Sequence, residues 1–128
     1  MAVKWGEHNQ AKWSGIRPGI DGDQVLVPFN TNVNTTLYTV AADKILLLTD
    51  WCLGVTRNKT VETALTVRDN TAAVQAYIAK VSTMTAAPGG SLFGSTFFPI
   101  ELIVAWDIRL NAAGETCTGY IHGILVDA

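Results

Sequence analysis

The feature that most constrains this chain is a succession of short apolar runs, each separated from the next by a turn signal. The runs are rich in β-branched and aromatic residues, and many alternate apolar with polar positions, as strands with one buried face do. From residue 24 onward this pattern predicts about eight or nine strands. Such spacing is typical of an antiparallel β-sandwich or barrel, so we expect an all-β fold.

The longest expected strand runs from Ile45 to Arg57. A period of two divides its apolar residues between two faces, with Ile45, Leu47, Trp51, Leu53 and Val55 on one and Leu46, Leu48 and Cys52 on the other. The start of this strand is therefore apolar on both faces.

Prolines and one ambiguous segment set the remaining expectations. Pro28 is expected to end a first strand over residues 25–27, and Pro99 to open a new strand over residues 100–104. Residues 71–82 also admit a short helix, because Val74, Ile78 and Val81 stand at helical spacing. We favour a strand there, since a period of two fits equally well and the neighbouring segments are strands.

Residues 1–23 differ from residues 24–128 and are expected to form an N-terminal arm in front of a single β domain. The arm has no regular period, yet it carries Trp5 and Trp13, and disordered tails are poor in aromatic residues. Two interpretations remain open. In the first, the arm folds back over its own core. In the second, it docks its tryptophans on a neighbouring subunit, which is supported by the preference for tryptophan as an interface anchor.

Composition excludes several classes of function. Charged residues make up only 16% of the 128 residues, against about 25% in typical domains, which favours a surface partly covered by partners. The net charge is −2 and the nine Lys and Arg residues are scattered, so we expect no nucleic-acid binding. No apolar run is long enough for a membrane span or a signal peptide, so we expect no membrane association and synthesis in the cytoplasm.

No constellation of residues predicts catalysis, a cofactor or a metal. His8 and His122 lack Cys, Asp or Glu at a ligand spacing. Cys52 and Cys117 are able to form a disulfide in an oxidising compartment, and buried free thiols are the favoured interpretation. Glu101 and Asp107 are able to face each other only if they fall on adjacent strands, and solvated acids are the favoured interpretation. Tyr77 and Tyr120 are expected as surface or interface contacts. We therefore expect a protein that is not an enzyme.

Four segments, taken in order, carry a family resemblance: residues 36–49 (TLYTVAADKILLLT), 65–69 (LTVRD), 97–102 (FFPIEL) and 119–123 (GYIHG). Together they resemble small jelly-roll proteins in the virions of tailed bacteriophages, of the capsid decoration or head-fibre type. The resemblance covers about residues 35–125. Ala42 stands where such proteins usually have proline before the turn, and the resemblance does not extend to residues 1–34.

The resemblance implies a jelly-roll β-sandwich in a homotrimeric virion protein that is assembled in the host cytoplasm. Its expected partners are itself and the major capsid protein or other virion proteins. We expect the arm to supply contacts through Trp5, Trp13 and Ile16, and a decoration (cement) role is favoured. The alternative is a receptor- or carbohydrate-binding module of a fibre or tail tip, with Tyr77 and Tyr120 contacting a host-surface glycan.

Overall fold

The structure, a computed structural model, describes residues 22–55, 61–83 and 90–128. The strands are β1 (Asp23–Thr31), β2 (Thr35–Thr39), β3 (Lys44–Val55), β4 (Val61–Arg68), β5 (Val74–Thr83), β6 (Gly90–Leu102), β7 (Asp107–Asn111) and β8 (Cys117–Asp127). The all-β expectation is confirmed, and residues 74–83 form a strand rather than a helix. Most of the predicted N-terminal arm lies outside the described residues.

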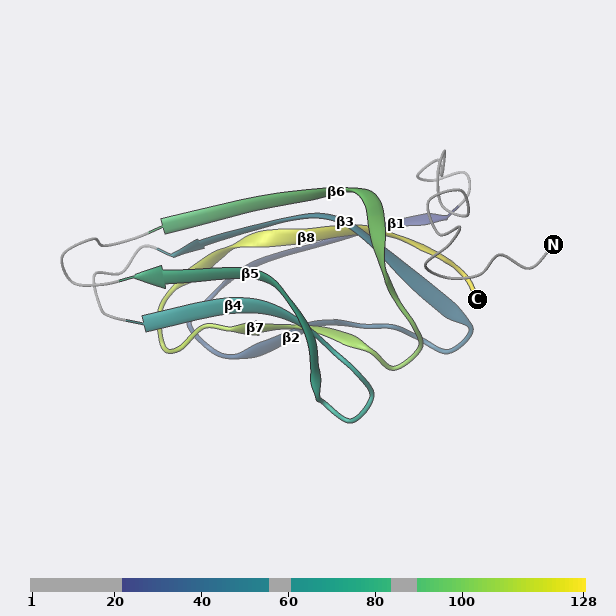
Figure 1. Ribbon diagram of the computed structural model, residues 1–128, viewed down its shortest axis with the longest axis horizontal. Coiled ribbons are helices and arrows are strands. Elements are labelled where there is room, and N and C mark those ends of the chain that lie inside the picture. The colour runs from purple at the N-terminus through teal and green to yellow at the C-terminus, as the bar shows by residue number, and fades with distance from the viewer. Residues whose placement is uncertain (1–21, 56–60, 84–89) are drawn as a thin grey trace.

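Two four-stranded antiparallel sheets face each other across the core (Figure 1). One sheet has the order β1-β8-β3-β6 and the other the order β2-β7-β4-β5. The pairings are nested along the chain: the first strand pairs with the last, β2 with β7, β3 with β6, and β4 with β5. Two further pairings, β3 with β8 and β4 with β7, join these hairpin-like pairs into the two sheets.

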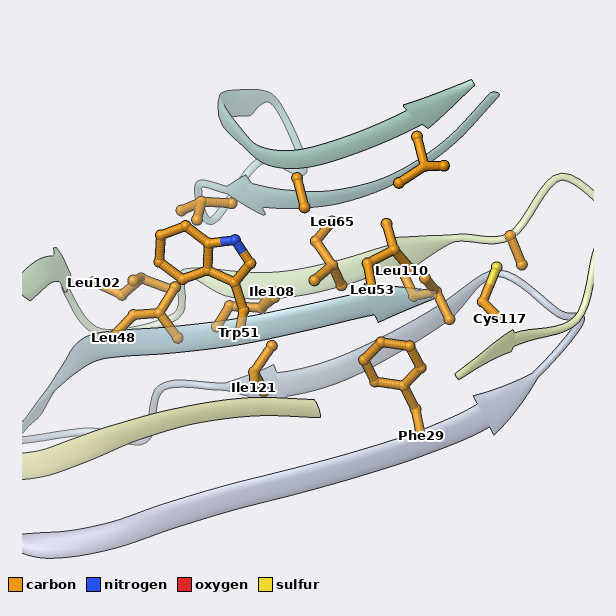
Figure 2. Close-up of a cluster of buried hydrophobic side chains, with 14 of the residues drawn as sticks. Phe29, Leu48, Trp51, Leu53, Leu65, Leu102, Ile108, Leu110, Cys117 and Ile121 are labelled. Carbon is orange, nitrogen blue, oxygen red and sulfur yellow. The ribbon is translucent and has the colours of Figure 1, made fainter. Parts of the chain in front are cut away.

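The core lies between the inner faces of the two sheets (Figure 2). Leu48 and Leu53 on β3 contribute to it from one sheet, and Leu65 on β4 and Leu110 on β7 from the other. All four are 0% exposed. Burying leucine contributes roughly 1.5–3 kcal/mol per side chain, so this interior supplies the main driving force for folding.

A β-bulge in β3 changes which residues face the core. The register of β3 shifts between Leu48 and Asp50 against both neighbours. Opposite β8, Thr49 is an extra residue in β3, whereas opposite β6 the extra residues are 96–99 of β6. The two-residue period therefore changes phase, and Leu46 and Leu48 face the core together with Trp51. The grouping of Ile45 and Leu47 with Trp51 was wrong for this reason.

Neither proline breaks a strand where the sequence suggested. β1 continues through Pro28, which pairs with Tyr120 of β8. β1 lies at the edge of its sheet, where a residue without a backbone N–H is tolerated. Pro99 lies inside β6, opposite the bulge of β3, and β6 ends at Leu102. Glu101 and Asp107 fall in different sheets, so they are not neighbours on adjacent strands.

Candidate functional site

The sequence-predicted contact residues fall into two groups. Trp5, Trp13 and Ile16 lie outside the described residues. Tyr77 and Tyr120 are described, and they belong to different sheets: Tyr77 lies on β5 and Tyr120 on β8. The fold therefore does not bring these two tyrosines together into one stacking platform.

Tyr77 lies on an edge strand and is 60% exposed. The ammonium group of Lys80 lies 4.8 Å from the centre of its ring, a distance at which the cation and the ring attract each other. Glu62 on β4 holds the same ammonium group at 3.1 Å. The result is a small exposed cluster of an aromatic ring and two opposite charges.

Tyr120 is half-buried on the outer face of the other sheet. It lies between Pro28 of β1 and Cys52 of β3 in the strand pairing. Desolvation, followed by the negative charge of Asp50, raises the pKa of its phenol above the usual value of 10.0. The phenol is therefore neutral at physiological pH and is able to donate a hydrogen bond.

Beside Tyr120 the fold brings together Thr49, Asp50 and His122. The Nδ1 atom of His122 lies 2.6 Å from Asp50 Oδ1 and 3.1 Å from Thr49 Oγ1. The bulge makes this possible, because it turns Asp50 outward opposite His122. The sequence interpretation treated His122 as isolated, and the only signal for the contact was the pairing of two strands far apart in the chain.

This cluster does not have the arrangement of a catalytic triad. In a triad, the hydroxyl and the carboxylate bind different nitrogens of the imidazole ring, so that the ring relays a proton between them. Here both oxygens contact the same nitrogen of His122. Thr49 Oγ1 also donates to the backbone carbonyl of His122 at 3.2 Å. The contacts therefore fix the bulge of β3 to β8.

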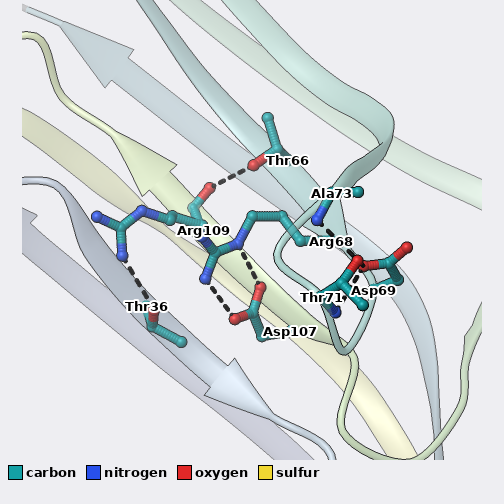
Figure 3. Close-up of polar contacts among 8 residues, drawn as sticks. All are labelled: Thr36, Thr66, Arg68, Asp69, Thr71, Ala73, Asp107 and Arg109. Carbon is teal, nitrogen blue, oxygen red and sulfur yellow. Dashed lines mark hydrogen bonds and ion pairs between the residues drawn. The ribbon is translucent and has the colours of Figure 1, made fainter.

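The outer face of the second sheet carries a polar ladder (Figure 3). Arg68 on β4 donates two hydrogen bonds to Asp107 on β7, at 2.8 and 2.6 Å. Arg109 donates to Thr36 of β2 at 3.2 Å, and these contacts tie three neighbouring strands together. The Arg68 and Asp107 side chains are only 18% and 13% exposed, so this two-bonded ion pair is shielded from water.

We expect Asp107→Ala to destabilise the protein by about 1–3 kcal/mol, because it leaves the guanidinium group of Arg68 partly buried without its partner. The double variant Arg68→Met/Asp107→Leu is expected to lose less stability than the sum of the losses in Arg68→Met alone and Asp107→Leu alone. Urea denaturation of the single and double variants measures the coupling. Glu62→Gln is the matched control, because its ion pair with Lys80 is exposed and worth about 1 kcal/mol or less. Equal losses of unfolding free energy in Asp107→Ala and Glu62→Gln would contradict the conclusion that the Arg68–Asp107 ion pair is shielded from water.

The turn between β4 and β5 is organised by Asp69. Its carboxylate accepts hydrogen bonds from the backbone N–H groups of Thr71 and Ala73, at 2.8 and 3.1 Å, and from the Thr71 hydroxyl at 2.6 Å. The Gln75 amide adds a bond to the second oxygen at 2.9 Å. The bonds from Thr71, above all, lower the pKa of Asp69 below its usual value of 3.8.

A lowered pKa means that Asp69 stabilises the fold when it is ionised. We therefore expect wild type to be more stable than Asp69→Ala by a constant amount above about pH 5. The difference should shrink as the pH falls below 3.8, through the lower pKa of the folded state. Denaturation curves across this pH range test the expectation. Asn70→Ala, in the same turn, changes no titrating group and is the control. If the stability difference between wild type and Asn70→Ala showed the same pH dependence, the role of Asp69 would be contradicted.

Two further observations concern possible ligands and membranes. In the ranges 22–55, 61–83 and 90–128, no group of three or more His, Cys, Asp or Glu side chains is placed to hold a metal ion. The part of the chain that the structure describes also contains no helix long and apolar enough to cross a bilayer.

Cys52 is half-buried and Cys117 buried, both as free thiols, and burial raises the pKa of Cys117.

Comparisons with known proteins assign no family: no protein-family model, no curated protein and no solved structure matches this chain.

Proposed function

We propose that this chain is a structural protein of a bacteriophage virion, a trimeric capsid decoration protein built on a jelly-roll sandwich. The observation that carries the proposal is the nested strand pairing, in which β1 pairs with β8, β2 with β7, β3 with β6 and β4 with β5. A jelly roll is such a long antiparallel hairpin rolled into two sheets of four strands each. The strand order therefore supports the finer description of the fold.

The resembling segments support the same proposal by their positions. Residues 36–49 span most of β2, the following turn and the start of β3. Residues 119–123 lie in β8, where Gly119 and Gly123 both leave no room for a side chain against β3. The glycines of the GYIHG segment thus have a physical reason, because the backbone of β3 approaches β8 too closely for a Cβ at these two positions.

The proposed mechanism is burial of apolar surface between subunits and against the shell. Each Å² of apolar surface removed from water contributes roughly 25 cal/mol, and a specific interface of standard size buries about 1,600 Å² in total. Repeated around a shell, such contacts oppose its expansion. Trp5, Trp13 and Ile16 in the arm are the proposed contact residues, and the low share of charged residues favours extensive contact.

The test is capsid occupancy with and without the arm. The full chain and a variant lacking residues 1–22 are each mixed with empty capsids assembled from the major capsid protein of the encoding phage, and sedimented. We expect the full chain to sediment with the capsids in a fixed ratio and the shortened chain to remain free. Val33→Ser, an exposed change outside the arm, is the matched control and should sediment normally. A full chain that stays free, or a shortened chain that occupies capsids fully, would contradict the proposal.

A second candidate function is glycan binding at a fibre or tail tip, and the exposed ring of Tyr77 favours it. Sugar rings stack on exposed aromatic faces. Tyr77 is 60% exposed even with Lys80 beside its ring, so part of the ring is accessible to a ligand. A glycan array decides the matter. Binding that disappears in Tyr77→Ala and remains in Tyr77→Phe would support this function, whereas the decoration role predicts no glycan signal from either variant or from wild type.

A further inference from the structure

One outer face of the sandwich carries a second apolar cluster, separate from the core. It consists of Ile45 and Leu47 on β3 and Ile124 and Val126 on β8, and we call these four residues the outer patch. Leu47 is 0% exposed, Ile124 4% and Val126 7%. Apolar side chains on the outer face of a sheet are normally in water, so their burial requires a cover.

The opposite sheet does not supply that cover. The residues that alternate with the outer patch along β3, Leu46 and Leu48, belong to the core between the sheets, and Leu125 on β8 packs against the same core. Side chains of neighbouring residues on a strand point to opposite faces. The outer patch therefore faces away from the second sheet, and something outside the two layers lies over it.

The connections at the far end of the sandwich are too distant to reach the outer patch. Residues 56–60 follow Val55, the last residue of β3, and residues 84–89 precede Gly90, which pairs with Val55. Ile45 lies at the other end of β3. A strand rises about 3.3 Å per residue, which separates Val55 from Ile45 by roughly 33 Å.

The described chain begins directly on the outer patch. A side chain added at Gly22 would lie 2.7 Å from a methyl carbon of Ile124 and 2.8 Å from one of Val126. Gly22 therefore packs against the outer patch so closely that no Cβ fits. The residues that precede Gly22 leave from this point, and the exposures quoted above belong to a single chain without any partner.

We infer that residues 1–21 of the same chain dock on the outer patch. The segment carries the apolar anchors that such a surface requires, with Ile20, Ile16 and Trp13 within nine residues of Gly22. Its reach is ample, because extended residues span up to about 3.3–3.6 Å each and neighbouring strands lie about 4.8 Å apart. The docking belongs to the free protein and does not depend on the proposed capsid role. The capsid contacts proposed for Trp13 and Ile16 require the arm to exchange the outer patch for the shell.

Paramagnetic broadening tests the inference in the full chain. A nitroxide label is attached at Ser14→Cys in a Cys52→Ser background, where Cys117 is 0% exposed and is not labelled. Gln10→Cys provides a second label site in case the first perturbs folding. We expect the methyl signals of Leu47, Ile124 and Val126 to lose most of their intensity. The methyl signals of Val55, at the far end of β3, should be unchanged and serve as the control.

A second sample distinguishes docking within one chain from docking between two. Spin-labelled chains without isotopes are mixed with isotope-labelled chains without a nitroxide, and the mixture is refolded together. We expect no broadening of the outer patch in this sample. Broadening there would assign the cover to the arm of another copy, and unbroadened patch signals in the first experiment would show that the arm lies elsewhere. Either result overturns the inference, and neither depends on whether the protein binds capsids.

Discussion

Gly119→Ala is expected to destabilise the protein by about 3 kcal/mol, at the upper end of the range for overpacking. Gly119 lies on β8 between β1 and β3, and an added Cβ would collide with the backbone carbonyl of Cys52 and lie 2.9 Å from the ring of Phe29. A backbone carbonyl in the middle of a sheet cannot move aside as the end of a flexible side chain can. The change should therefore separate β8 from β3 locally, and urea denaturation monitored by the fluorescence of the tryptophans measures the loss.

Gly114→Ala is the matched control, because at Gly114 the backbone conformation and not the available space disfavours a side chain. Gly114 has a φ of 77°, and nothing lies within 4 Å of the position that its Cβ would take. The added methyl group has space there, and only the left-handed backbone conformation costs about 1 kcal/mol. Equal losses for the two variants would mean that the close approach of β8 to β3 is not as the structure has it.

Leu53→Ala is expected to cost about 2–5 kcal/mol, because it removes a 0% exposed side chain from the core and leaves a cavity. Leu53 follows the bulge in β3 and lies in the core with Leu110 of the opposite sheet. Neither sheet is able to close the gap without shifting its hydrogen-bonded strands. The midpoint of denaturation should fall, and the dependence of unfolding free energy on urea should stay unchanged.

Leu26→Ala makes the same chemical change on the surface. Leu26 is 62% exposed on β1, so its truncation is expected to change stability by about 0.5 kcal/mol or less. The comparison depends on the position of each leucine and not on its chemistry. A loss at Leu26 as large as that at Leu53 would contradict the assignment of the core to the space between the sheets.

The sequence predicted the strands because alternation reports directly on a half-buried strand. Ile108 and Leu110 alternate with polar residues and are both 0% exposed in β7. The apolar pattern on both faces at the start of the longest strand was also informative, since Leu46 lies in the core and Leu47 in the outer patch. Burial on two faces requires two covers, which a simple two-layer sandwich does not provide.

The bulge and the contacts that depend on it could not be predicted from residue patterns. A period of two has no means of marking Thr49 as an extra residue, and the shift depends on how β3 pairs with both neighbours. The contact between Asp50 and His122 follows from that shift and joins residues 72 positions apart. The passage of β1 through Pro28 depends equally on tertiary structure, because it requires the edge position in the sheet.

Multi-angle light scattering of the purified full chain is the most direct test of the proposed assembling role. One chain has a mass of 13.8 kDa. We predict that the protein elutes at three times this mass and that the mass holds on dilution into the micromolar range, as expected for an extensive apolar interface between subunits. A mass of 13.8 kDa at the highest concentration that remains in solution would contradict a homotrimer and with it the proposed decoration protein.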